Sequence, residues 1–151
     1  ARYLWMTFEL PVRVSRVIRG TVDQVWRAHH DASLMKRWLL GPDGWTMPVC
    51  EMDVRVGGGY KLVFDYQGNE MPFFGRYTEV VLESRLVWTN DEAGDAGQIS
   101  TVTFEDLGGS TRVVLSERFA SKQALEDAMA SGSMEGAKAQ FEQLEEFVAS
   151  P

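Results

Sequence analysis

Few side chains in this sequence could hold a metal ion. His29 and His30 are its only histidines, and Cys50 is its only cysteine. Neighbouring residues of a helix point about 100° apart, so the two histidines cannot easily bind one ion. Because there is neither a second cysteine nor a His-x-x-x-His spacing, we predict no metal site and expect the histidines at a surface helix end. A lone cysteine excludes an internal disulfide and is typical of a reducing cytoplasm.

Side chains arranged for nucleophilic catalysis are equally scarce. Serines and acidic residues are numerous, so composition alone leaves a Ser-His-Asp triad open. The G-x-S-x-G spacing of a nucleophile elbow does not occur, and the "GGS" at 108–110 is typical of a hairpin turn. We therefore predict no catalytic residue and no cofactor.

The three consecutive glycines Gly57, Gly58 and Gly59 could belong to a phosphate-binding loop or to a turn. A phosphate loop requires a Lys-Ser/Thr ending and a helix after the glycines. Here "YKLVFDY" follows and alternates like a strand. We interpret the glycines as a tight reversal between antiparallel strands, where a positive φ is cheap only for glycine. The sequence therefore predicts no nucleotide site.

The elements that position these side chains follow from hydrophobic periodicity. A strand is expected at 11–19, a helix after an N-cap at Thr21, and a second short helix at 32–39, before the break "GPDG" at 41–44. Turn signals then separate further strands, expected at 45–55, 59–67, 71–82, 85–90, 98–106 and 111–119. From Ser121 to 149 the spacing of apolar residues indicates a long amphipathic helix, weakened at "SGS" (131–133). This order predicts a single α+β domain spanning 1–151.

Composition restricts the partners. The 151 residues carry a net charge of −7, and no sequence window shows a basic stripe, so we expect no nucleic acid to bind. No apolar run approaches the roughly 20 residues that span a bilayer, and "ARYLWMTFEL" does not have the features of a secretory signal. We expect a cytoplasmic protein without a membrane partner.

Five segments, in order, carry a resemblance to one family. They are "VDQVWRAHHDASLMKRWLLGPDGW", "DVRVGGGYKLVF", "FFGRYTEVVLESRLVWT", "VTFEDLGGSTRVVLSERF" and "GAKAQFEQLEEF". Over residues 11–149 the chain resembles bacterial relatives of the C-terminal domain of the heat-shock-protein ATPase activator, in the START/SRPBCC superfamily. The resemblance implies a helix-grip (START/birch-pollen-allergen-like) fold. In this fold a curved antiparallel sheet of six to seven strands wraps a long C-terminal helix around an apolar cavity, with two short helices after the first strand.

The sequence departs from the family pattern at two places. Ala137 stands where members often have a tryptophan, which would enlarge a pocket, and Arg19-Gly20 replaces an Ala-Pro pair, which would alter a turn.

The implied cavity gives a role to the apolar strand faces. Aromatic side chains alternate along several predicted strands, and the face of the C-terminal helix can cover them. Each of these residues, taken singly, is better explained as ordinary core. Together they form our predicted ligand-binding set: Tyr60, Leu62, Phe64, Tyr66, Phe73, Tyr77, Trp88, Phe104, Glu117, Met129 and Phe141.

Glu117 is the one acidic residue in that set. The alternation of "TRVVLSERF" directs it inward with Val113, Leu115 and Phe119. An inward carboxylate either marks a site or lies at the rim near the end of the strand, where it is solvated or bonded to a tyrosine or an arginine, and we favour the rim.

We expect a non-catalytic, cytoplasmic module that binds a hydrophobic or aromatic small molecule between sheet and helix. Superfamily resemblance leaves two alternatives: a cyclase acting on a polyketide-type substrate, or a chaperone-interaction module of the stress response. The eukaryotic activator has an additional N-terminal domain for which this chain has no room, so we favour a chaperone partner less. A homodimer is left open.

Overall fold

The computed structural model describes residues 12–39 and 44–149, with the side chains of residues 133 and 134 excepted. Residues 1–11, which include the first position of the strand expected at 11–19, and most of the expected "GPDG" break lie outside this description. In chain order the elements are β1 (Val12–Ile18), α2 (Val22–His30), α3 (Ala32–Trp38), β2 (Trp45–Met52), β3 (Gly59–Tyr66), β4 (Asn69–Val81), β5 (Arg85–Thr89), the 3-10 helix η1 (Asp91–Ala96), β6 (Ile99–Asp106), β7 (Thr111–Arg118), α4 (Lys122–Ala130) and α5 (Ser133–Ala149).

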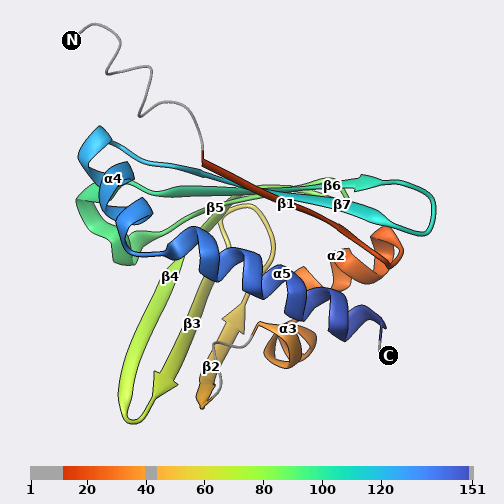
Figure 1. Cartoon of the computed structure of the whole chain (residues 1–151), viewed down its shortest axis with the longest axis horizontal. Helices are drawn as coiled ribbons and strands as arrows, with labels where there is room; N and C mark the ends of the chain where they lie inside the picture. Colours follow the sequence, from red (N-terminus) through yellow and green to blue (C-terminus); the bar gives the residue numbers. More distant parts are fainter. Residues whose placement is uncertain (1–11, 40–43, 150–151) are drawn as a thin grey trace, which may run out of the picture.

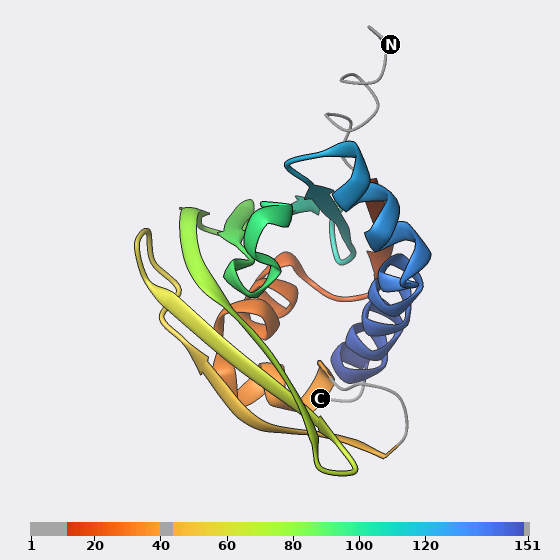
Figure 2. The same ribbon diagram turned by 90° about the vertical axis from the view of Figure 1, so that its left-hand side faces the viewer.

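Seven strands form one antiparallel sheet in the order β1-β7-β6-β5-β4-β3-β2. The sheet curves, and α5 crosses its concave side (Figure 1). In the view turned by 90°, strands β2–β4 and helix α5 lie on opposite sides of the molecule, and α2 and α3 lie between them (Figure 2). The predicted helix-grip fold is confirmed.

The bend of the sheet lies in β4. Residues 69–76 of this strand pair with β3, whereas residues 77–81 pair with β5, and the register shifts between Tyr77 and Glu79. Gly75 sits at the change of partner, where an added Cβ would lie 2.2 Å from the carbonyl oxygen of Thr89. Only glycine permits this close approach of two backbones. The long strand can therefore pair with β3 over its first part and with β5 over its second part.

The triple glycine joins β2 to β3, as predicted. Gly57 adopts a φ of +85°, and its N–H donates to the carbonyl of Tyr77 at 2.8 Å. Tyr77 returns a bond from its N–H to the carbonyl of Gly58 at 2.9 Å. The turn thereby docks onto β4. The N–H of Gly57 is bonded to the sheet and the N–H of Gly58 to the carbonyl of Arg55 within the turn, so neither is available to a phosphate.

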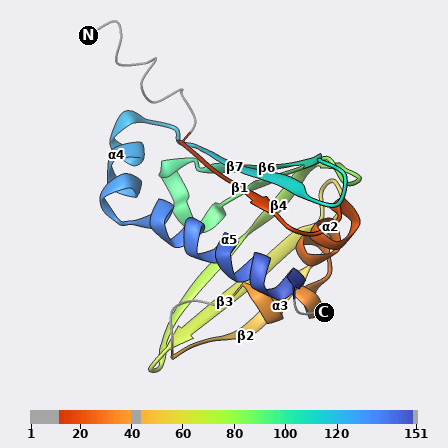
Figure 3. The same ribbon diagram turned by 45° about the vertical axis from the view of Figure 1, so that its right-hand side comes forward.

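Helix boundaries follow from local capping. Thr21 and Gln24 form a capping box at the start of α2, and Ser121 accepts from the N–H of Ala124 at the start of α4. The expected weak point in the C-terminal helix is a complete break: Gly132 has a φ of +79° and separates α4 from α5. The two helices diverge at this turn (Figure 3).

The main core lies between α5 and the face of the sheet directed toward it, here called the inner face. Phe141 and Leu144 of α5 pack there with buried residues of β1, β5, β6, β7 and the two short helices. An ion pair ties α5 to the edge strand, because Arg16 of β1 donates to Glu145 at 2.8 Å. These contacts fix the helix relative to the inner face.

Candidate ligand-binding site

A row of four side chains crosses the inner face at one register. Glu117 of β7 pairs with Ser100 of β6, Ser100 with Trp88 of β5, and Trp88 with Tyr77 of β4. Paired residues of antiparallel strands point to the same face, and neighbouring strands lie about 5 Å apart. We call these residues the polar–aromatic row, since a carboxylate lies at one end and two aromatic rings at the other.

The aromatic end of the row continues onto β3. The ring of Tyr77 lies 6.2 Å from that of Trp88 and 5.7 Å from that of Tyr60. The Tyr60 hydroxyl donates to the carbonyl of Thr89 at 2.6 Å, and burial raises the pKa of both tyrosines, so both stay neutral. Trp88 is only half buried, so this end offers ring surface at the margin of the core.

The polar end of the row is a buried carboxylate. Glu117 is 6 % exposed, and its Oε2 accepts from Ser100 Oγ at 2.7 Å and from Gln98 Nε2 at 2.8 Å. Asn90 supports this pair by donating to Ser100 Oγ at 2.9 Å and to the carbonyl of Gln98 at 3.2 Å. The rim position that we favoured for Glu117 is therefore wrong. It is buried, and its partners are an amide and a hydroxyl instead of a tyrosine or an arginine.

Two carboxyl groups near this end have raised pKa values. Desolvation is the main cause for Glu117; the bonds from Gln98 and Ser100 act against it, and the charge of Glu92 on η1 adds to it. Desolvation likewise raises the pKa of Glu92, whose Oε1 accepts from the Phe74 N–H at 3.0 Å. This corner of the molecule thus concentrates negative charge in a poorly solvated place.

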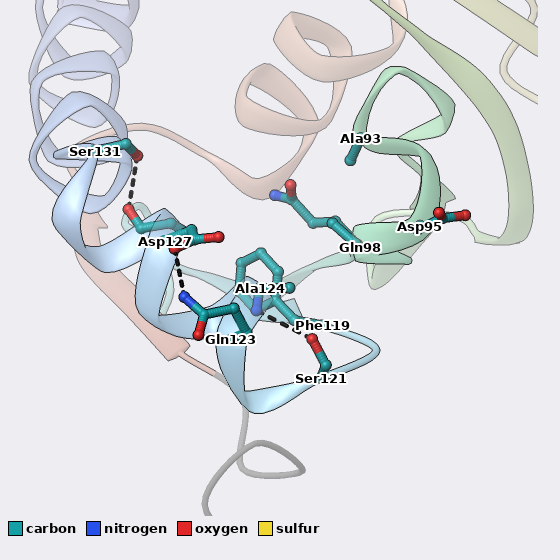
Figure 4. Close-up of a pocket in the computed structure, with 11 residues that line it drawn as sticks. Ala93, Asp95, Gln98, Phe119, Ser121, Gln123, Ala124, Asp127 and Ser131 are labelled. Carbon is teal, nitrogen blue, oxygen red and sulfur yellow. Dashed lines mark hydrogen bonds between the residues drawn. The ribbon is translucent and has the colours of Figure 1, made fainter.

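A groove of about 490 Å³ opens between η1 and α4, next to the polar end. Gln98 and Phe119 lie between the two walls, with Asp95 on the η1 side and Asp127 on the α4 side (Figure 4). Gln98 connects the groove to the row, because the same side chain lines the groove and donates to Glu117. Sequence reasoning missed this groove, since the turn signal "DEAGDAG" (91–97) predicts only a break between the strands expected at 85–90 and 98–106.

The eleven predicted residues are not all in one place. Tyr60, Tyr77, Trp88 and Glu117 meet in or beside the row, whereas Phe104 and Phe141 belong to the main core and Leu62 packs against it.

A second aromatic group lies on β2–β4 near the β3–β4 hairpin. Phe64 contacts Trp45 and Phe73, with centroids 6.3 and 5.8 Å apart, and Tyr66 contacts Trp45 at 5.6 Å. Met129 is on α4 and is 54 % exposed.

His29 is not at a surface helix end. It is 5 % exposed, its ring lies 5.0 Å from Phe104 and 5.1 Å from Trp38, and Nδ1 donates to the Val25 carbonyl at 2.9 Å. Its neighbour His30 is exposed and stacks on Trp26. Because α3 packs over the end of α2, the inner histidine of the pair becomes part of the core.

Within the described parts of the chain, histidine, cysteine and acidic side chains nowhere form a group of three that could hold a metal ion. Among the helices of residues 12–39 and 44–149, none is both long enough and apolar enough to cross a membrane.

Comparison with known proteins adds the family. The model of a family described as Activator of Hsp90 ATPase homolog 1-like protein matches residues 19–149. A solved protein of Nitrosomonas europaea is 26 % identical, with a TM-score of 0.84 over 93 % of this chain and 95 % of its own. One of Chromobacterium violaceum is 28 % identical, with a TM-score of 0.76 over 93 % and 98 %. An AHSA1-like protein of Aeromonas hydrophila, 21 % identical with a TM-score of 0.71 over 92 % and 93 %, shares the fold. Among curated proteins no match is found.

Proposed function

The chain belongs to the Activator of Hsp90 ATPase homolog 1-like family, and on that premise we propose that it binds a hydrophobic or aromatic small molecule between the curved sheet and α5, without catalysing a reaction on it. The observation that carries the proposal is the polar–aromatic row. It joins half-buried ring surface to one buried polar group on the face of the sheet that is directed toward α5. Small-molecule sites in proteins combine mostly apolar walls with a few oriented polar groups in this way.

The aromatic side chains supply the apolar surface. Burial of apolar area contributes about 25 cal/mol per Å², so a two-ring ligand that covers the half-buried ring of Trp88, beside the buried Tyr77, would gain several kcal/mol. Leu62 and the group of Phe64 and Phe73 extend the same strand face away from the row. In this proposal the lining of the site or its margin also includes Tyr60, Tyr66, Phe104, Met129 and Phe141. We further propose that the protein is located in the cytoplasm.

A titration with the neutral fluorophore N-phenyl-1-naphthylamine tests the proposal. We expect its emission to rise and saturate, and the melting temperature of the protein to increase, because a ligand that binds only the folded state stabilises it by mass action. Trp88→Phe should weaken the fluorescence response more than it lowers stability, since the smaller ring keeps the packing but offers less contact area.

Leu82→Ala provides the control, because Leu82 is 74 % exposed in the turn that follows β4 and is not a residue of the row. It should leave the titration unchanged. An emission that never saturates, or that Leu82→Ala and Trp88→Phe alter equally, would refute binding at the row.

Contact with a protein partner is a second candidate, favoured by exposed aromatic rings. Phe73 and Phe74 point to opposite faces of β4, and 38 % and 41 % of their surfaces are exposed. Large apolar side chains in contact with water often mark protein-binding surfaces. Stimulation of the ATPase rate of a purified Hsp90 that is lost in Phe74→Ser would support this function. An unchanged rate with the wild-type chain would exclude it.

A further inference from the structure

The two carboxylate oxygens of Glu117 differ in their hydrogen bonds. Both of its donors, Gln98 and Ser100, bond to Oε2, while Oε1 makes no hydrogen bond to the described residues. A carboxylate oxygen can accept two bonds, so Oε1 keeps unused acceptor capacity in a side chain that as a whole is buried. The arrangement holds the carboxyl group in place through one oxygen and leaves the other available.

The surroundings favour a positively charged partner for that oxygen. Glu92 lies close enough to raise the pKa of Glu117, and the adjoining groove is lined by Asp95 and Asp127. Lysine, arginine and histidine are absent from the described lining of the groove. Ring faces attract cations, and Trp88 is two strands from Glu117 in the same row. A cation is therefore drawn to this corner, whereas an anion is repelled.

From these contacts we infer that the ligand is an apolar amine in its protonated form, with its ammonium group bonded to Oε1 of Glu117 and its hydrocarbon or aromatic body reaching along the row to the half-buried ring of Trp88. The inference rests on the proposed function, because it names the class of molecule that the same row would take. An ammonium group suits the geometry, since it has three donors and no acceptor and so competes with neither Gln98 nor Ser100. The groove provides its route of approach, past Asp95 and Gln98.

Four naphthalene derivatives of nearly equal size separate the contributions of charge and ring. They are 1-naphthylmethylamine, 1-naphthalenemethanol, 1-methylnaphthalene and 1-naphthoate. Each is titrated against the whole chain by intrinsic tryptophan fluorescence at about pH 8, well above the ordinary pKa of a glutamate. We expect the amine to bind about 10- to 100-fold more tightly than 1-methylnaphthalene, the range of a charge-assisted hydrogen bond. The alcohol should fall between them, and the carboxylate should bind most weakly.

Glu117→Gln tests the residue itself. The amide keeps an oxygen for Gln98 and Ser100 but carries no charge, so the preference for the amine over 1-methylnaphthalene should disappear while 1-methylnaphthalene binds as before. The matched control is Glu142→Gln, which removes the same charge from the exposed side of α5 and should preserve the preference.

The outcomes separate the two proposals. If all four compounds bind the wild-type chain equally, or the alcohol binds better than the amine, the amine inference is overturned while the proposed function stands. If none of the four binds, the proposed function fails and the inference fails with it. The comparison among ligands on the wild-type protein decides this even where Glu117→Gln does not fold.

Discussion

Acid should destabilise this protein through one histidine. His29 lies in the core against Phe104 and Trp38, and burial lowers its pKa from 6.5 to about 4. A pKa that is lower in the folded state means that the folded chain binds this proton less readily than the unfolded chain. The stability that the neutral ring contributes is therefore complete above pH 6.5 and is lost as the pH falls through about 4. At about 1.4 kcal/mol per pH unit, the total is about 3 kcal/mol.

His29→Leu removes the titrating group and keeps the site apolar. It also removes the Nδ1 bond to Val25, a net cost of about 1 kcal/mol that does not change with pH. Denaturant unfolding of both proteins at about pH 7.5 and about pH 4.5 should show that the wild type loses about 2–3 kcal/mol more than the variant over this interval.

The difference between the two proteins isolates His29, because the carboxyl groups titrate alike in both. His30→Gln, which changes the exposed neighbour, should retain the wild-type acid dependence. Parallel stability curves for the wild type and His29→Leu, or a His29 ring that titrates near 6.5 by NMR, would refute the burial argument.

Two further predictions concern the row and the backbone. Because burial raises the pKa of Glu117, the contribution of this carboxyl group to the stability of the wild type should fall as the pH rises from the ordinary glutamate value through the raised one. In denaturant unfolding, Glu117→Gln should therefore gain stability relative to the wild type as the pH rises above about 5, and a relative loss would contradict the buried environment. Gly136→Ala should stabilise the chain by about 0.5–1 kcal/mol, because an added Cβ at this position of α5 meets nothing within 4 Å. Gly75→Ala should destabilise it strongly, because there the Cβ meets the carbonyl oxygen of Thr89 at 2.2 Å. Similar melting temperatures for the two variants would show that β4 does not approach β5 as described.

The fold was largely predictable because its signals are local. Alternation placed all seven strands within a few residues of their observed ends, and the triple glycine identified the β2–β3 reversal from the strand that follows it. Gly132 marked the weak point of the C-terminal helix, although the sequence indicated a softening and the structure has a break. Each of these features depends on residues close together in the chain.

The site was only partly predictable, because its contacts join segments that are distant in sequence. Alternation correctly directed Glu117 to the inner face, but its partners Gln98 and Ser100 come from the approach to β6 and β6 itself, and only the register between strands brings them together. His29 appeared to end a surface helix because nothing in its own helix reveals that Trp38 will cover it. The groove requires η1 and α4 to meet, and no pattern within either segment predicts that.

A cluster of positive charge on the outer face of the sheet was likewise not predictable from the sequence. No sequence window contains a basic stripe, yet Arg13, Arg85 and Arg118 come together from three strands around a hollow of about 260 Å³. Hydroxyl groups of Thr101, Thr103 and Ser116 lie between them. Because side chains alternate between the faces of a strand, Arg118 faces outward one residue after Glu117 faces inward.

This alternation determines which charged side chains lie near Glu117 at the polar end of the row. Glu117 is buried without a cationic partner among the described residues, although arginines are available one residue away and on the neighbouring strands. An arginine next to Glu117 on the inner face would have paired with the carboxylate and removed its capacity to bind anything else. Instead Arg13, Arg85 and Arg118 lie on the outer face, and the inner-face Arg16 pairs with Glu145 of α5. Glu117 has two neutral donors on one oxygen, which hold its orientation but leave its charge uncompensated. A carboxylate kept in this state costs stability in the free protein, and a ligand that supplies the missing positive charge recovers that cost on binding.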